Sequence, residues 1–162
     1  MGMCLSEKRA KSALDCINGV RGRCSESFGK RVYSKMAKNK SQSEHDSIVK
    51  SVAEFLSKNG YRNIRAAVDG YEKPDKISLS HLRGSHVPDV TTEKNGKHYL
   101  FEVETDDSIH DERTKDKWEL FSAYAKEQKG FFIISVPPGS GNKARTRLAH
   151  LGLRAYDVLE AN

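Results

Sequence analysis

The feature that most restricts the fold is the segment FFIISV at residues 131–136. It is apolar at every position except Ser135, so it has no polar face to turn toward water. A continuous apolar run of this length is typical of a β-strand that is covered on both faces. Sheets covered on both sides occur in α/β proteins, where helices pack against each face. The segment therefore predicts an α/β fold with a central sheet.

The remaining periodic segments supply the helices and strands that such a sheet needs. Apolar residues at helical spacing predict helices, and short runs bounded by Gly, Pro and Asn predict strands. In chain order we expect a helix capped by Ser43 and ended by Asn59-Gly60, a strand at 63–68, a polar loop at 69–86, two hairpin strands within 88–105, a helix capped by Thr105 or Asp106 that buries Trp118, Phe121 and Ala125 and ends at Gly130, a strand at 131–136, a helix at 142–151 and a strand at 153–159. This αβββαβαβ order predicts a three-layer α/β sandwich with a central mixed sheet flanked by helices.

Asn95-Gly96 is the strongest turn signal in the chain, because a two-residue type I′ turn needs a positive φ at both central positions. Such a turn pairs residues whose numbers sum to 191, so Asp89 is expected to face Glu102. Side chains alternate between the faces of a sheet, which places Glu104 on the same side as Glu102. The hairpin therefore predicts three carboxylates that converge.

Two interpretations of these acids stay open from the hairpin alone. Like charges directly opposite each other destabilise a sheet, and a divalent cation such as magnesium between Asp89 and Glu102 would reverse that effect. The alternative is a solvated, acidic strand end without a ligand. In either case the repulsion among clustered acids predicts that at least one has a raised pKa in the absence of metal.

The length and composition predict one soluble domain with a real core. No apolar run approaches the roughly 18 residues of a membrane span, and no signal-peptide pattern opens the chain. The three cysteines, Cys4, Cys16 and Cys24, lack the spacing of a zinc site. We therefore expect free thiols, a cytoplasmic location and no membrane partner.

The positive charge belongs to the first 40 residues. Residues 1–40 hold ten Lys or Arg and three Asp or Glu, a balance of +7, and the total of +6 leaves −1 for residues 41–162. The sequence predicts a poorly ordered basic arm at 1–40, with one short helix near 7–17, followed by an α/β domain at 41–162. Two interpretations stay open: the arm adds affinity for phosphate backbones, or residues 1–35 precede the natural start, since Met36 opens a plausible N-terminus.

With Pro88-Asp89, a hairpin and then an acidic strand reading FEVET, residues 43–160 resemble the PD-(D/E)XK nuclease superfamily, whose fold is the restriction-endonuclease-like fold. The small resolvase-like members are the most similar in pattern. The resemblance implies a magnesium-dependent endonuclease, with manganese as a substitute metal. It assigns metal binding to Asp89, Glu102, the carbonyl of Val103 and an early helical acid, Glu44.

The sequence departs from the family where its motif has a Lys, because Glu104 stands there. A Lys beside the metal orients the attacking water and offsets phosphate charge, whereas a Glu could accept the proton of the water. Lys115 or Lys117 on the following helix could supply the missing cation, although an ordinary solvated helix face explains each of them as well. A catalytically inactive nucleic-acid-binding module on the same fold is the alternative function.

Several basic residues are candidate contacts to DNA, with RNA not excluded and a homodimer possible. Phosphate contacts come mostly from Lys, Arg and helix-borne donors. The candidates are Arg83 and His86 in the long loop, and Lys143, Arg145 and Arg147 in the last helix.

Overall fold

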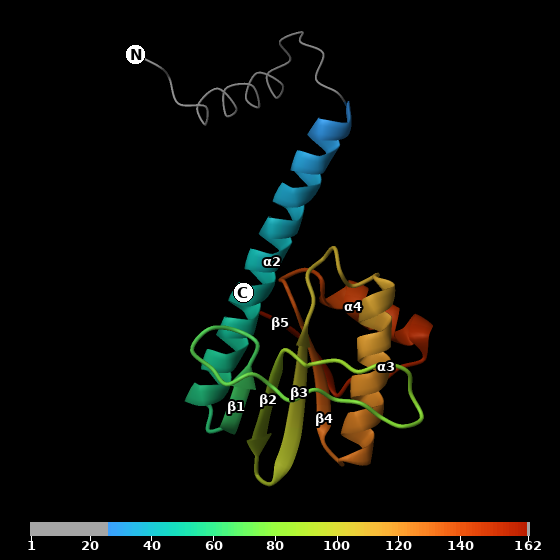
Figure 1. Ribbon diagram of the computed structural model, residues 1–162. Helices are drawn as coiled ribbons and strands as arrows, with labels where there is room; N and C mark the ends of the chain where they lie inside the picture. The colour runs from blue at the N-terminus through green and yellow to red at the C-terminus, as the bar shows by residue number, and fades with distance from the viewer. Residues whose placement is uncertain (1–25, 162) are drawn as a thin grey trace. The chain divides into compact units, whose positions relative to one another are not determined.

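The structure, a computed structural model, describes residues 26–161 (Figure 1). The chain divides after Lys40 into two units, and the unit Ser41–Asn162 holds the whole sheet. The elements in chain order are α2 (Glu26–Lys58), β1 (Arg62–Ala66), β2 (Val90–Lys94), β3 (Lys97–Val103), α3 (Glu112–Glu127), β4 (Phe131–Val136), α4 (Gly141–Leu151) and β5 (Asp157–Glu160).

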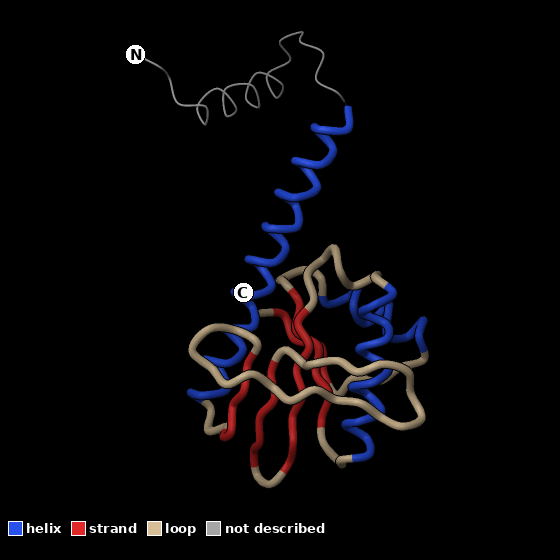
Figure 2. The backbone as a smooth tube through the Cα atoms, in the orientation of Figure 1, coloured by secondary structure: helices blue, strands red, loops and turns tan. Residues whose placement is uncertain are grey.

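The five strands form one mixed sheet in the order β1-β2-β3-β4-β5. β1, β2 and β3 are antiparallel neighbours, whereas β4 is parallel to β3 and β5 is parallel to β4. Helices flank the sheet (Figure 2), so the predicted α/β class with a mixed sheet is confirmed. The segment FFIISV forms β4 as predicted, with residues 132–136 all buried.

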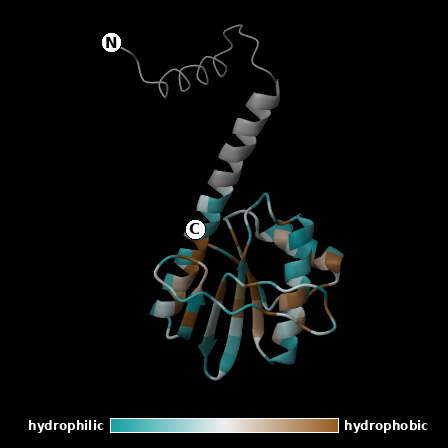
Figure 3. Cartoon of the chain, in the orientation of Figure 1, coloured by the Kyte–Doolittle hydropathy of each residue, from teal (hydrophilic) through white to brown (hydrophobic). Residues whose placement is uncertain are grey.

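Two hydrophobic clusters lie on the two faces of the sheet. One joins the C-terminal part of α2, through residues such as Val49 and Leu56, to Val90 and Phe101. The other joins Trp118 of α3 and the apolar residues of α4 to the opposite face. Figure 3 shows hydrophobic residues on the strands and on the helices that cover them. The predicted burial of Trp118, Phe121 and Ala125 is confirmed.

The hairpin between β2 and β3 is the one that the turn signal predicts. Asn95 and Gly96 have φ values of 52° and 70°, and the register pairs Val90 with Phe101. The ladder ends at that pair. The predicted pairing of Asp89 with Glu102 is therefore not part of it. The Asp89 carboxylate instead accepts the Val103 N–H at 2.8 Å, a donor that a longer ladder would give to a backbone carbonyl.

Two helix starts differ from the prediction. α2 begins at Glu26 rather than at a cap on Ser43, because residues 31–42 contain no Gly or Pro to interrupt a helix. α2 thus includes residues 26–40, which the sequence predicted as part of a poorly ordered arm. The short helix predicted at 7–17 and the three cysteines lie outside the described residues. α3 begins after Asp111, not after Thr105 or Asp106. The intervening residues form tight turns, in which the N–H groups of Ser108 and Asp111 donate to the carbonyls of Thr105 and Ser108.

The remaining differences are small. β1 and β5 are shorter than the predicted 63–68 and 153–159. The loop at 69–86 packs Ile77 against the α3 side of the sheet, and a single bridge pairs Ile77 with His86. Among the described residues, no helix is long and apolar enough to cross a membrane.

Candidate acidic site at the end of β3

Strand alternation brings two acids to the face that α3 covers. Leu100 of β3 belongs to the α3-side core, and Glu102 follows two residues later on the same face. Glu104 comes directly after β3, and its N–H donates to the carbonyl of Ser135 on β4 at 2.9 Å, which prolongs the strand geometry. Glu102 is fully buried and Glu104 is 3% exposed. Two carboxylates therefore lie in the interior beside α3.

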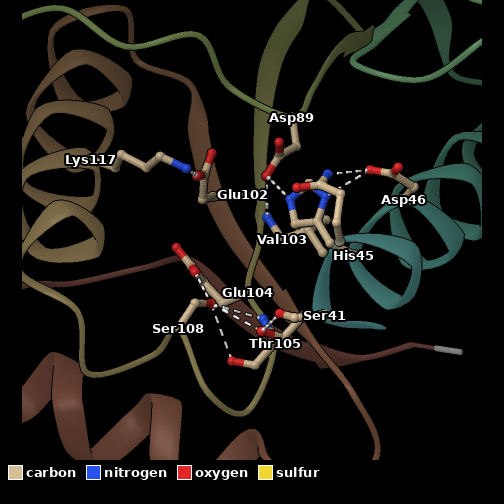
Figure 4. Close-up of polar contacts among 11 residues, drawn as sticks. Ser41, His45, Asp46, Asp89, Glu102, Val103, Glu104, Thr105, Ser108 and Lys117 are labelled. Carbon is tan, nitrogen blue, oxygen red and sulfur yellow. Dashed lines mark hydrogen bonds and ion pairs between the residues drawn. The ribbon is translucent and has the colours of Figure 1, made fainter. Parts of the chain in front are cut away.

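Lys117 of α3 supplies the cation at this site. Its ammonium Nζ donates to Glu102 Oε1 at 2.5 Å, as Figure 4 shows. Burial raises the pKa of Glu102 well above its usual 4.5, and the nearby charge of Asp89 raises it further, while Lys117 acts against both. For Lys117, burial is outweighed by the charge of Glu102 and the hydrogen bond to it, so its pKa is raised. The direction is the one predicted for these acids, but its larger cause is burial and not repulsion among them.

Glu104 is held by hydroxyl groups at the start of the loop before α3. Ser108 Oγ donates to Glu104 Oε2, and it also accepts the Thr105 N–H at 3.0 Å. Thr105 Oγ1 in turn lies 3.0 Å from Ser41 Oγ of α2. Burial raises the pKa of Glu104, and the hydrogen bond from Ser108 acts in the opposite direction. A carboxylate with a raised pKa accepts a proton more readily near neutral pH.

Two carboxylate oxygens in this site have no hydrogen-bond donor among the described residues. They are Glu102 Oε2 and Glu104 Oε1, and both are buried. A buried acceptor without a donor is costly, and most such atoms in proteins have a partner. The unpaired oxygens therefore mark the side of the site on which a cation or a donor from a ligand would be accommodated.

Asp89 lies where β2 and β3 separate, and it contacts α2. Its Oδ2 atom accepts the Val103 N–H and lies 3.3 Å from Nε2 of His45. The other ring nitrogen of His45 lies 3.3 Å from Asp46 Oδ1. Burial acts to lower the pKa of His45, but the hydrogen bonds and charges of Asp89 and Asp46 raise it overall. His45 is thus a link between α2 and the acidic site.

His45 replaces the residue that the sequence suggested on this helix. Glu44 is exposed, and it has no hydrogen bond or ion pair with another residue of the described chain. The structure therefore does not bring Glu44 to the acids of the site. The signal was available: His45 lies three and four residues before the buried Ile48 and Val49, so it shares their face of the helix.

The structure also distinguishes between the two candidate lysines of α3. Lys115 and Lys117 are two residues apart, which directs them to different sides of a helix. Lys117 contacts Glu102, whereas no contact joins the Lys115 side chain to an acid of the site in the described residues. Of the two candidates for the missing cation, the structure brings only Lys117 to the acids.

The predicted nucleic-acid contacts do not form one basic surface. Lys143 contacts both oxygens of Asp106 at 2.6 Å, and Arg145 donates to the Val158 carbonyl at 2.9 Å. Arg147 is mostly buried and lies 3.6 Å from Glu112. These three cations of α4 are therefore engaged within the molecule.

The two loop candidates differ from those of α4. Arg83 is exposed and has no ion pair among the described residues. His86 is half-buried, and burial together with the charge of Lys117 lowers its pKa. Of the two loop candidates, only His86 thus has a described interaction with a residue of the acidic site.

A magnesium ion at this site would have few protein ligands. Among the described residues, no group of three or more His, Cys, Asp and Glu side chains is arranged to hold a metal. Magnesium, however, is commonly held by one or two carboxylates and completes its shell with water and substrate phosphate. Asp89 and Glu102, with the Val103 carbonyl, would be the protein ligands of such an ion, and Oε2 of Glu102 has no hydrogen-bond donor among the described residues.

No protein-family model matches the chain, and no curated protein matches it.

Proposed function

We propose that this protein is a metal-dependent phosphodiesterase that cleaves DNA, built on a restriction-endonuclease-like fold. The observation that carries the proposal is the contact of Lys117 Nζ with the fully buried Glu102. It joins a cation from α3 to the acid that the resemblance assigns to magnesium. The position of the missing motif Lys would thereby be filled from a helix instead of from β3.

The metal would be held by Asp89, Glu102 and the Val103 carbonyl, as the resemblance implies. When bound, magnesium supplies a polarised phosphate oxygen and an activated water. The chain itself contributes a dry site, because Glu102 and Glu104 are almost fully excluded from solvent. Electrostatic interactions are stronger in such an environment than in bulk water.

Glu104 is the residue proposed to accept the proton of the attacking water. Its Oε1 atom has no donor within the described chain, while Ser108 fixes Oε2. Burial raises its pKa, which favours proton transfer near neutral pH. Lys117 is proposed to offset negative charge on the phosphate, the role of the motif Lys in the family that the chain resembles.

Arg83 and His86 are the proposed contacts to the DNA backbone. They belong to the loop that crosses the α3 side of the sheet, and His86 lies within the field of Lys117. The basic residues of α4 support this role less, because Lys143, Arg145 and Arg147 have partners inside the molecule. A substrate backbone would therefore approach along the loop.

A second candidate function is a catalytically silent module that binds nucleic acid. It is favoured by the partners of Asp89, whose Oδ2 atom is engaged by the Val103 N–H and by His45. Lys117 likewise occupies Oε1 of Glu102. In this interpretation the acids and cations neutralise one another and form a structural network.

The decisive experiment measures cleavage of supercoiled plasmid, a four-way junction and a flap by the purified full-length protein. Each substrate is tested with magnesium, with manganese and with a chelator. Asp89→Ala should abolish cleavage and leave DNA affinity within about two-fold, and Glu104→Gln should lower turnover by about 10²- to 10⁴-fold, the usual contribution of a general base. Glu44→Ala is the matched control and should cleave like the parent, since Glu44 is exposed.

Three outcomes distinguish the candidates. Metal-dependent cleavage that is lost in Asp89→Ala supports the phosphodiesterase. Cleavage that persists with the chelator, or that Asp89→Ala retains, contradicts it. Binding without cleavage of any substrate supports the silent module.

A separate result concerns Glu104. Higher activity in Glu104→Lys would show that Glu104 stands in place of the motif Lys and does not act as a proton acceptor.

A further inference from the structure

A row of four aromatic rings crosses the sheet at the end opposite to the acids. Tyr61 precedes β1, Tyr99 lies in β3, Phe131 begins β4 and Tyr156 precedes β5. Neighbouring ring centroids are 5.2 Å apart for Tyr61 and Tyr99, 4.8 Å for Tyr99 and Phe131, and 4.4 Å for Phe131 and Tyr156. These distances are those of attractive aromatic pairs. We call these four residues the aromatic row.

The aromatic row leaves the core as it proceeds toward β5. Tyr61 and Tyr99 pack against the α2-side hydrophobic cluster. Phe131 is half-buried and Tyr156 is 66% exposed, and neither belongs to a hydrophobic cluster of the described chain. Aromatic side chains that stabilise a core are normally buried in it. The outer half of the row therefore has more exposed ring surface than packing of the fold requires.

Four cations lie beside residues of the aromatic row. Lys94 Nζ lies 4.5 Å above the ring of Tyr61. Lys97, Lys129 and Arg154 each stand two residues before a member of the row, and all three are exposed. None of these three forms an ion pair with another described residue.

Two acids also lie at this end, and both keep their charge because their hydrogen-bond donors are neutral. Glu93 accepts from the Asn63 side-chain amide, and Asp157 accepts the backbone N–H of Val158 at 2.7 Å. The four cations beside the aromatic row outnumber these two acids, so the balance of charge there is positive.

We propose that the aromatic row binds the bases of single-stranded nucleic acid, without sequence preference, and that the surrounding cations bind its phosphates. Stacking of successive bases on aromatic rings inside a basic groove is the general mode of such binding. A second copy of this chain fits the surface less well, because an isologous contact would bring the same cations against one another. A polyanion carries the complementary charge.

This surface is separate from the acidic site. Tyr99 faces the α2 side near the start of β3, whereas Glu102 faces the α3 side near its end. The rise of about 3.3 Å per residue places these two positions of the strand roughly 10 Å apart along it. Binding at the row therefore does not depend on the proposed cleavage, and it can be measured in a chelator.

The test measures fluorescence anisotropy of labelled dT20 with the full-length protein in EDTA. Tyr156→Ala should weaken binding about ten-fold, because one stacking ring is lost, and Tyr156→Phe should bind like the parent. Phe55→Ala is the matched control: Phe55 is an exposed aromatic residue at 58% that lies outside the row, so its loss should leave affinity unchanged. Lys129→Ala should lower the slope of log affinity against log salt by about 0.7.

A change of ligand separates stacking from charge attraction. Tyr156→Ala should not change the affinity for a 20-nucleotide abasic strand, which has the phosphates but no bases. Its affinity for a blunt 20-base-pair duplex should also equal that of the parent. Equal affinity of Tyr156→Ala and the parent for dT20 would overturn the proposal. A concentration-dependent dimer in sedimentation that Tyr156→Ala dissociates, without an effect on dT20, would instead assign the row to contact between copies.

Discussion

The two faces of β3 are buried to the same degree but have different roles. Phe101 and Val103, which face α2, are 2% and 1% exposed, while Glu102 and Glu104, which face α3, are 0% and 3% exposed. Burial of apolar side chains stabilises the fold, whereas burial of a carboxylate costs free energy unless it is paired. One face of the strand therefore supports the fold, and the other stores unfavourable free energy at a site suited to chemistry.

Hydrogen bonding draws the same contrast. Glu102 and Glu104 each keep one buried oxygen without a donor from the described chain. Their other oxygens are satisfied by Lys117 and Ser108. A site that only stabilised the fold would gain by satisfying all four oxygens, since an unmade buried hydrogen bond costs more than a made one contributes.

The first prediction concerns a substitution on the apolar face, which should have the largest effect on stability. Phe101→Ala should lower the free energy of unfolding by about 3–5 kcal/mol, because it removes a buried ring and leaves a cavity. Glu102→Gln, on the next residue and of nearly the same size, should not destabilise the metal-free protein, since relief from burying a charge offsets the weaker contact with Lys117. Urea unfolding in EDTA measures both. A loss in Glu102→Gln as large as that of Phe101→Ala would show that both faces serve stability.

The second prediction concerns removal of the Lys117 ammonium from the acidic face. Lys117→Ala should lower the free energy of unfolding by about 3 kcal/mol at pH 8, because it leaves a fully buried carboxylate without its partner. The double variant Lys117→Ala/Glu102→Gln should recover most of that loss. Lys115→Ala is the matched control on the same helix and should stay within about 0.5 kcal/mol. Additive losses in the double variant would mean that the contact carries no coupling.

Much of the fold could be predicted from local sequence signals. The Asn95-Gly96 turn fixes the hairpin register, and the apolar run at 131–136 fixes β4. The helix starts were predicted less well. Ser43 is a good cap residue, but a cap acts only where the preceding residues leave the helix, and here they continue it. α3 starts late because residues 105–111 form turns in which Ser108 bonds to Glu104 and Thr105, contacts that no local helix signal predicts.

The candidate site was predictable on its strand and less so on its helices. Period-two alternation correctly places Glu102 and Glu104 together, because the strand has only two faces. The choice between Lys115 and Lys117 depended on the rotation of α3 about its axis, which is set by the packing of its buried residues against the sheet. His45 was missed because the resemblance drew attention to an acid, although the buried positions Ile48 and Val49 indicated its direction.

The third prediction sharpens the contrast through pH, and its effect should be smaller because proton uptake by Glu102 limits the cost of its burial. Since burial raises the pKa of Glu102 above 4.5 in the folded state, the folded protein binds more protons than the unfolded chain above that pH. Its contribution to stability is therefore fully present below pH 4.5 and is lost as the pH rises through the folded pKa. Glu104 and His45, whose pKa values are also raised, act with the same sign.

The measurement is urea unfolding of the metal-free protein at intervals from pH 5 to pH 8. The parent should lose stability across this range, and Glu102→Gln should show a shallower decline, because Glu104 and His45 still titrate. Glu44→Gln, which changes an exposed acid, should follow the parent curve. Addition of magnesium should stabilise the parent more at pH 8 than at pH 5, since a metal binds the deprotonated carboxylates. Identical slopes for the parent and Glu102→Gln would mean that Glu102 releases its proton as easily in the folded protein as in the unfolded chain. Burial of its carboxylate would then cost no free energy of folding.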